Sequence, residues 1–207
     1  MAEKIDFKKS LESYRAPKGD FQILDVPDLQ YLMVDGHGDP NTSPAYADAL
    51  AALYPVAYKL KFASKNRLAL DYVVPPLEGL WWAEDMETFT ISRDKSRWDW
   101  TMMLMVPDWI EASLVEEAIA LVGGVAEAPS RLGDVRLAGL REGRCVQTLH
   151  VGSYDDEAPV LDRMHHEFIP EQGLRMSGKH HEIYLSDVRK VAPEKLRTIL
   201  RQPVALI

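Results

Sequence analysis

The segment HHEIYL, residues 180–185, places an imidazole, a carboxylate and a phenol on one face of an expected strand. Side chains alternate across a strand, so His180, Glu182 and Tyr184 share one side. Ile183 points to the other side, where we expect it to pack on a helix. A partly buried carboxylate supplies a counter-charge for a cation, or accepts a proton when its pKa is raised.

Two further expected strands carry tryptophans. LEGLWW bears Glu78 and Trp82 on one face, and RWDWTMM bears Trp98 and Trp100 on one face. We expect Glu78, Trp82 and Trp100 to join the HHEIYL carboxylate and phenol on a concave sheet face. Such an aromatic cleft suits a planar, lipophilic and often cationic molecule, held by ring contacts of about 0.5–2 kcal/mol each. The same tryptophans fit an ordinary core equally well, since pockets are also mostly apolar.

The two HHE triplets, at residues 165–167 and 180–182, raise the question of a metal site. Neighbouring strand residues point to opposite faces, and neighbouring helix residues diverge by about 100°, so neither triplet forms a one-face ligand set. The HExxH pattern is also absent. We therefore expect no metal, and we expect His181 to be a packed or capping side chain.

Other reactive groups are few. No G-x-S-x-G elbow occurs, and neither a Walker loop nor GxGxxG occurs, so no cofactor is expected. Cys145 lies in an expected strand and is interpreted as a buried core side chain. A role as a thiol nucleophile is the alternative. Tyr154, in the loop HVGSYDDE, either points its hydroxyl into the cleft or caps the loop.

The elements that position these side chains form two similar halves of an α+β chain. HGDPNTSPAYADALAALYP and HVGSYDDEAPVLDRMHHEFIP each run from a strand through a glycine-containing loop into a helix expected to end at proline, and Pro55 corresponds to Pro170. Each half then reaches a glutamate-bearing strand. We expect one domain, 1–207, with pseudo-symmetric β-α-β-β modules at about 20–125 and 130–207, although any α+β chain offers such coincidences.

Local patterns predict further elements. Residues 56–63 and 68–74 are expected to be strands. Ser113 and Glu116 form an expected capping box for a helix through Leu121. Pro193 is expected to open a final short helix through residue 201.

Composition narrows the class of protein. The 207 residues are 46% apolar, which is typical of a globular chain, and their net charge of −8 argues against binding a phosphate backbone. No apolar run reaches the roughly 18 residues of a membrane span, and the start has no signal-peptide core. With one cysteine, we expect a cytoplasmic protein without nucleic-acid or membrane partners.

Several long motifs, in order, resemble the GyrI-like small-molecule-binding family. They are DGHGDPN, VVPPLEGLWW, the W-x-WTMM run, QTLHVGSYDDE and HHEIYLSDVRKVAPEKLRTILRQPV. The likeness extends from near residue 4 to the C-terminus. It implies a curved antiparallel sheet made of two modules, with helices on one side and a ligand cleft between the modules.

The resemblance also implies roles for individual residues. Glu182 corresponds to the central acidic residue of the family's pocket, Trp82 and Trp100 to its aromatic residues, and Tyr154 to its Gly-x-Tyr loop. Ser153 stands where the family pattern leads us to expect proline. Val188 also stands where proline is expected, and both residues lie beside the pocket motifs rather than in them.

Similar domains serve as effector-binding modules of multidrug-responsive transcription activators, and a related member inhibits DNA gyrase. The motifs are most similar to a stand-alone subfamily that hydrolyses cyclopropanoid DNA-alkylating compounds; no helix-turn-helix precedes them here. We therefore expect a cofactor-independent hydrolase for xenobiotic detoxification. The alternatives are a drug-sequestering protein and, less expected, an inhibitor that binds a partner such as gyrase.

In the expected mechanism, Trp82, Trp100 and Tyr184 clamp a planar ring system. Glu182 orients or deprotonates a water that attacks the cyclopropane. Tyr154 stabilises the charge that develops as the ring opens. Glu78 adds to the electrostatic field in the cleft or holds a second water molecule.

Overall fold

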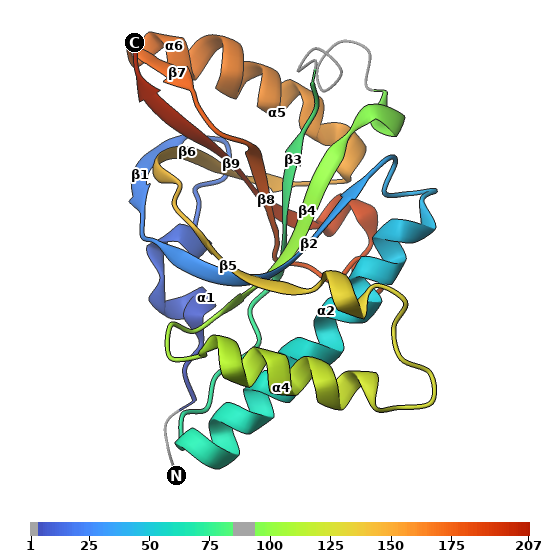
Figure 1. The fold of residues 1–207 in the computed structure, drawn as a ribbon. Helices are drawn as coiled ribbons and strands as arrows, with labels where there is room; N and C mark the ends of the chain where they lie inside the picture. The colour runs from blue at the N-terminus through green and yellow to red at the C-terminus, as the bar shows by residue number, and fades with distance from the viewer. Residues whose placement is uncertain (1–3, 85–93) are drawn as a thin grey trace.

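The computed structural model describes residues 4–84 and 94–207. Within these residues nine strands form one sheet, and every strand pairing in it is antiparallel. The strands are β1 (Gln22–Val26), β2 (Leu29–His37), β3 (Leu77–Trp82), β4 (Asp99–Val106), β5 (Arg136–Leu140), β6 (Gly143–Val151), β7 (Leu174–Met176), β8 (His180–Tyr184) and β9 (Arg197–Leu206). Their order is β1-β6-β9-β8-β3-β4-β2-β5, with β7 beside β9, and the sheet curls strongly (Figure 1).

The described residues also form the helices α1 (Phe7–Ser10), α2 (Pro44–Ala63), α4 (Ala112–Gly123), α5 (Ala158–Asp162) and α6 (Ile169–Glu171). Helices α2 and α4 pack together on one side, and α5 and α6 lie at the opposite end of the sheet (Figure 1). Shorter helical turns cover Glu12–Tyr14, Ser64–Leu68, Lys95–Arg97, Leu132–Asp134, Tyr154–Glu157, Arg163–Phe168 and Pro193–Lys195.

The strand order confirms the two-module architecture. One module runs β2-α2-β3-β4 and the other β6-α5/α6-β8-β9, and the sheet joins them where β3 pairs with β8. Strand β1 precedes the first module but pairs with β6 of the second, while β5 precedes the second module but pairs with β2 of the first. This exchange ties the modules into one sheet. The module limits given above stay a prediction.

The prediction that both module helices end at proline is wrong. Helix α2 continues through Pro55 to Ala63, so residues 56–63 are helical rather than extended. Pro170 lies in the first turn of α6, directly after a π-helical turn at Arg163–Phe168. Proline lacks the N–H that bonds to the carbonyl four residues earlier, and a widened π turn accommodates this loss without ending the helix.

Three other local predictions are also wrong. Residues 68–74 carry only an isolated bridge between Tyr72 and Ile5. Helix α4 has Glu111 at its N-cap, without a side-chain cap bond, instead of the predicted Ser113. The helical turn at Pro193 stops at Lys195, and the chain then forms β9, which lies between β6 and β8. Tertiary pairing here outweighs the local helix-start signal.

The sheet has an apolar cluster on each face. On the outer face Trp100 and Met102 pack under α2 with no exposed surface. On the inner face Met103, Ile183 and Ile199 pack against Tyr14 of the N-terminal segment. Ile183 therefore packs inside the curl, not on a helix as predicted. Among the described residues, no helix has the length and apolar character that crossing a membrane requires.

Candidate functional site

The candidate site lies where the two modules meet, on the outer face of β3 and β8. Gly79 of β3 is paired with Glu182 of β8, and Trp81 with His180. Directly paired residues in an antiparallel sheet share a face. The outer face of this pair therefore carries Trp81, His180, Glu182 and Tyr184, as strand alternation predicts for the last three.

A cavity of about 1020 Å³ opens over this face. Its walls come from α2, from β3 and β8, from the Tyr154 loop and from the start of α5. Its polar and aromatic lining residues include Tyr46, Trp81, Trp98, Tyr154, Glu157, His180, Glu182 and Tyr184. Because it borders both modules, the cavity has the place that the resemblance implied for a ligand cleft.

Glu182 stands at the centre of a short polar chain. Its Oε2 accepts a hydrogen bond from the Tyr184 hydroxyl at 2.7 Å. That hydroxyl oxygen accepts a hydrogen bond from Trp81 Nε1 at 3.0 Å. On the other side, Glu182 Oε1 lies 3.5 Å from His180 Nε2, and the Glu182 side chain is 14% exposed. One carboxylate oxygen of this lining residue is thus held by the Tyr184 hydroxyl, and the other lies beside an imidazole.

Gly79 makes this chain possible. A Cβ atom at this position would lie 2.8 Å from Trp81 Nε1, 3.2 Å from the Tyr184 hydroxyl and 3.3 Å from Met102 Sδ. The first distance is shorter than van der Waals contact allows, so a side chain here would displace Trp81 or Tyr184. The glycine of LEGLWW therefore leaves the space in which the two donors meet above the sheet.

Aromatic rings form the walls on both sides of Glu182. The ring of Tyr46, from α2, stacks on Trp81 at 6.4 Å between centroids, with an interplanar angle of 26°. Trp81 meets Trp98 edge-on at 5.8 Å, and Tyr154 meets Tyr184 edge-on at 5.7 Å. These packed rings offer faces and edges to a flat ligand without further ordering.

Both phenols next to the carboxylate remain protonated near neutral pH. Burial, and then the charge of Glu182, raise the pKa of Tyr154 to about 12. Burial and the same carboxylate raise the pKa of Tyr184 well above its usual value. Each hydroxyl can therefore act as a hydrogen-bond donor toward a ligand or toward Glu182.

Glu78 and Trp82 do not join this site. Within β3 they alternate with Gly79 and Trp81, and it is Gly79 that is paired with Glu182. Both side chains therefore point to the inner face, where Lys179 Nζ lies 3.1 Å from the centroid of the Trp82 ring. The predicted grouping assumed a register shifted by one residue, and such a shift exchanges the two faces.

Trp100 lies on the correct face but does not line the cavity. It is fully buried under α2, and its ring occupies the space above Gly36, where a Cβ atom would come within 2.0 Å of it. Its Nε1 donates to the carbonyl of Gly38 at 3.2 Å. Tyr46 covers it edge-on at 5.5 Å, so Trp100 supports a cavity wall from behind.

The sequence reasoning missed four lining residues that the structure supplies. The predicted register puts Trp81 on the opposite face, and Trp98 has no role in the prediction. Tyr46 lies in an apolar stripe of α2 that also contains Tyr54, and neither Tyr46 nor Glu157 gives a local signal of a site.

Glu78 belongs to a buried ionic cluster inside the curl. His181, which has no exposed surface, lies between Glu78 and Glu142, with 2.9 Å from a ring nitrogen to each carboxylate. Arg201 Nη1 donates to Glu142 at 2.8 Å, and Tyr14 donates to Glu78. Burial alone would lower the pKa of His181, but the two carboxylates raise it. His181 is thus a packed histidine, as predicted, held between two carboxylates.

The remaining candidate groups carry no separate chemistry. Cys145 is fully buried, and burial raises its pKa to about 12, so the thiol stays protonated. Within residues 4–84 and 94–207, no group of three or more His, Cys, Asp or Glu side chains could hold a metal ion.

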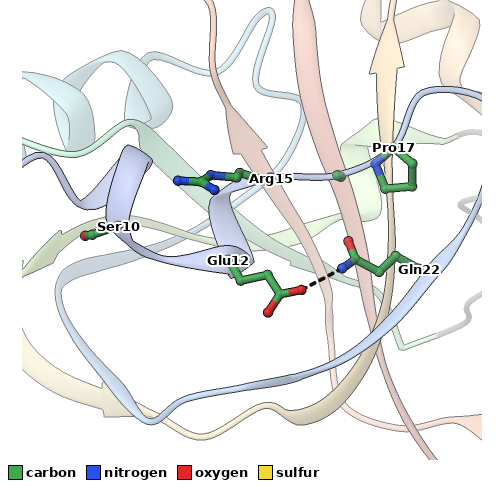
Figure 2. A pocket seen from close by; sticks show the side chains of 6 residues that line it. Ser10, Glu12, Arg15, Pro17 and Gln22 are labelled. Carbon is green, nitrogen blue, oxygen red and sulfur yellow. Dashed lines mark hydrogen bonds between the residues drawn. The ribbon is translucent and has the colours of Figure 1, made fainter.

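A second cavity, of about 410 Å³, lies beside the N-terminal segment, where Gln22 Nε2 donates to Glu12 at 3.0 Å (Figure 2).

Comparisons with known proteins support the fold. Residues 19–205 match the family of GyrI-like small molecule binding domains. An uncharacterized conserved protein from Listeria innocua is 41% identical, with a TM-score of 0.87 over 98% of this chain and 100% of that one. A hydrolase from Listeria innocua is 40% identical, with the same TM-score and coverage.

A more distant structure shares the fold alone. The C-terminal domain of EcmrR is 11% identical, with a TM-score of 0.58 over 91% of this chain and 98% of that one. A search of curated proteins finds no match to this chain.

Proposed function

The chain belongs to the GyrI-like family of small-molecule-binding domains, and from this premise we propose that its cavity binds flat aromatic, often cationic compounds. We propose further that it hydrolyses cyclopropane-containing electrophiles among them. The observation that carries both parts is a carboxylate, Glu182, set among aromatic rings with one oxygen held by Tyr184.

The size and lining of the cavity support binding of a ligand with several rings. About 1020 Å³ is at the upper end of ordinary small-molecule sites. A flat ring next to Trp81, Trp98 or Tyr46 gains stacking, and a cationic ring gains about 0.5–2 kcal/mol from a desolvated cation–π contact. Glu182 supplies the counter-charge at the centre of the lining.

Charges at the rim are compatible with a cationic ligand. Arg189 is held by Asp187 through two hydrogen bonds of 2.9 Å. Lys95 lies 3.1 Å from Asp155 and 5.9 Å from the centroid of the Trp98 ring. These basic side chains have acidic neighbours that offset their repulsion of a cation.

The proposed hydrolysis uses the second carboxylate oxygen, to which Tyr184 does not donate. Glu182 Oε1 accepts a proton from water while the water oxygen attacks the strained cyclopropane carbon. A C–O bond forms, a C–C bond of the ring breaks, and its electron pair passes to the conjugated carbonyl of the ligand, which then takes up a proton. Tyr154 donates to the oxygen on which this charge develops. The product contains one added water.

The similarity to a hydrolase from Listeria innocua supports a catalytic role, and ring strain supplies the driving force. Trp81 and Trp98 take the clamping role that the sequence assigned to Trp82 and Trp100. Glu78 has no place in this mechanism, since it lies on the other face of the sheet.

Mass spectrometry of a cyclopropanoid alkylator incubated with the purified protein tests the proposal. We expect wild type and the exposed control Glu194→Gln to add the mass of one water, and Glu182→Gln to lose this activity by roughly 10²–10⁴-fold. Full turnover by a folded Glu182→Gln would exclude Glu182 as the base.

The same experiment separates catalysis from sequestration. A ligand that quenches tryptophan fluorescence and is recovered unchanged would make the chain a drug-binding protein without activity. A ligand that neither quenches nor changes would contradict both parts of the proposal.

A further inference from the structure

One face of helix α2 lines the cavity along most of the helix. The lining residues of α2 extend from Tyr46, near its start, to Tyr58, near its end. With a rise of about 1.5 Å per residue, these two tyrosines lie about 18 Å apart along the helix axis. A cavity of this length has room for more than the one flat group that the proposed function places at Glu182.

The inner end of the cavity is aromatic. Tyr46 stacks on Trp81, which meets Trp98 edge-on. Trp81 lies near the end of β3 and is paired with His180, the first residue of β8. Because the two strands are antiparallel, the start of β3 and the end of β8 lie together at the opposite end of the pair.

The outer end of the cavity lies at that opposite end. The chain that enters β3, residues 73–76, and the chain that leaves β8, residues 185–190, both line the cavity. Lys61, within one turn of Tyr58 on α2, donates to Asp71 at 2.7 Å, so the end of α2 lies beside the entering chain. Tyr58 therefore stands at the outer end.

Two exposed apolar side chains line this outer end. Tyr58 is 48% exposed, and Val188, from the chain that leaves β8, is 58% exposed. Tyr54, one turn before Tyr58 on α2, lines the cavity as well. Apolar side chains that are exposed at a concave site, rather than scattered singly, indicate a surface that binds an apolar group.

Charges at the outer end are largely paired with one another. Asp187 contacts Arg189 at 2.9 Å and Lys190 at 3.5 Å. The neighbouring N-terminal segment adds Asp6 and Lys8, one charge of each sign. The carboxylate that can hold a cation among aromatic rings is at the inner end, so the outer end suits an uncharged group.

We propose that the outer end is a second subsite, which binds an uncharged flat ring beside Tyr58 and Val188. The ligand is then an elongated molecule of two linked flat groups. Its cationic or electrophilic group reaches Glu182, and its neutral group stays at the outer end. An apolar linker suits the stretch between them, which α2 lines with Leu50 and Pro55. This inference rests on the proposed function and adds the shape of the ligand to it.

Two acridine orange dyes of equal charge test the subsite. The short dye carries a methyl group on its ring nitrogen, and the long dye carries a naphthyl group on a propyl linker in its place. Because the linked naphthyl group binds as part of the same molecule, we expect wild type to bind the long dye at least about tenfold more tightly. Fluorescence titration measures both affinities.

Tyr58→Ala should remove most of this advantage. We expect its affinity for the long dye to fall by roughly 3–30-fold and its affinity for the short dye to stay within about twofold of wild type. Tyr58→Phe keeps the ring and should bind both dyes as wild type does. The matched control is Phe62→Ala, since Phe62 is 52% exposed one turn further along α2 and does not line the cavity. Both affinities should be unchanged in this control.

Wild type that bound the two dyes equally well would overturn the outer subsite. So would Tyr58→Ala if it kept full affinity for the long dye, or if it lost affinity for both dyes alike, as a structural defect would cause. In each of these cases, binding of the short dye by wild type would still support the proposed function. Wild type that bound neither dye would contradict the proposed function and the subsite together.

Discussion

Two glutamates on paired strands, Glu182 and Glu78, have opposite fates because they face opposite sides of one sheet. Glu182 lines the cavity, with one oxygen on the hydroxyl of Tyr184 and the other 3.5 Å from His180 Nε2. Glu78 is buried and contacts His181 and Tyr14, so its charge is neutralised inside the protein. A carboxylate is useful to a ligand only where protein partners leave part of it unsatisfied.

The contrast between Trp81 and Trp82 gives a prediction at this scale. Trp81→Phe should weaken binding of a cationic aromatic dye such as rhodamine by roughly 3–30-fold, because it removes both a stacking surface and the donor to Tyr184. Trp82→Phe should change affinity little, since Trp82 lies against Lys179 on the inner face. Fluorescence titration of both variants measures the difference. A larger loss of dye affinity with Trp82→Phe than with Trp81→Phe would show that the dye binds on the inner face of the sheet instead.

At the scale of the elements, the β3–β8 pair is what assembles the site. Strand β3 brings Trp81 and β8 brings the rest of the polar chain, and the missing side chain at Gly79 lets Trp81 and Tyr184 approach each other. Helix α2 adds Tyr46 above Trp81, and the Tyr154 loop closes the opposite wall. The site therefore depends on register between strands from different modules.

Gly79→Ala tests this dependence. The new Cβ atom, 2.8 Å from Trp81 Nε1, should displace Trp81 and cost about 1–3 kcal/mol of stability. The loss of backbone freedom in the unfolded chain, about 0.5–1 kcal/mol, offsets only part of this cost. The affinity of Gly79→Ala for the dye should also fall.

The matched control is Gly133→Ala, where a Cβ atom would meet nothing within 4 Å. We expect unchanged dye affinity and a small gain in stability of about 0.4–1 kcal/mol. Chemical denaturation and dye titration on both variants provide the comparison. If Gly79→Ala bound the dye as well as the control does, the close approach of Trp81 and Tyr184 would not matter for binding.

At the scale of the whole molecule, exchanged strands and the buried ionic cluster hold the curl together. Glu142, in the turn between β5 and β6, reaches His181 of β8 and Arg201 of β9. Arg201 also donates to the carbonyl of Ser13 at 2.5 Å, which fixes the N-terminal segment. The cluster therefore links parts of the chain from both ends of the sequence.

This cluster predicts how stability depends on pH. Burial alone would raise the pKa of Glu142, but His181 and Arg201 outweigh it and lower the pKa to about 2. A depressed carboxyl pKa means that the stabilisation is present above the unfolded value of about 4.5 and is lost as the pH falls toward 2. For His181, whose pKa is raised, the stabilisation is lost as the pH rises through the raised value.

Glu142→Gln should therefore destabilise the protein by about 3–5 kcal/mol at pH 7, since it leaves Glu78 as the one carboxylate of the cluster facing His181 and Arg201. The difference from wild type should shrink as the pH falls below about 4. Urea denaturation at several pH values measures this, with the exposed Glu127→Gln as control. A difference that stayed constant down to pH 2 would show that the charge of Glu142 is not its cause.

The sequence by itself determined the α+β class and the residues His180, Glu182 and Tyr184 that share a face of β8. These follow from local rules, because alternation along a strand and turn residues between elements need no knowledge of distant partners. The family resemblance added Tyr154, which the structure brings to the same cavity.

Only the tertiary structure decided which residues of β3 and β4 stand next to Glu182, and that Pro55 and Pro170 lie within helices. It also made residues 197–206 a central strand. The physical reason is that register and pairing are set by contacts between distant segments, and a shift of one residue moves a tryptophan from the cavity to the opposite face.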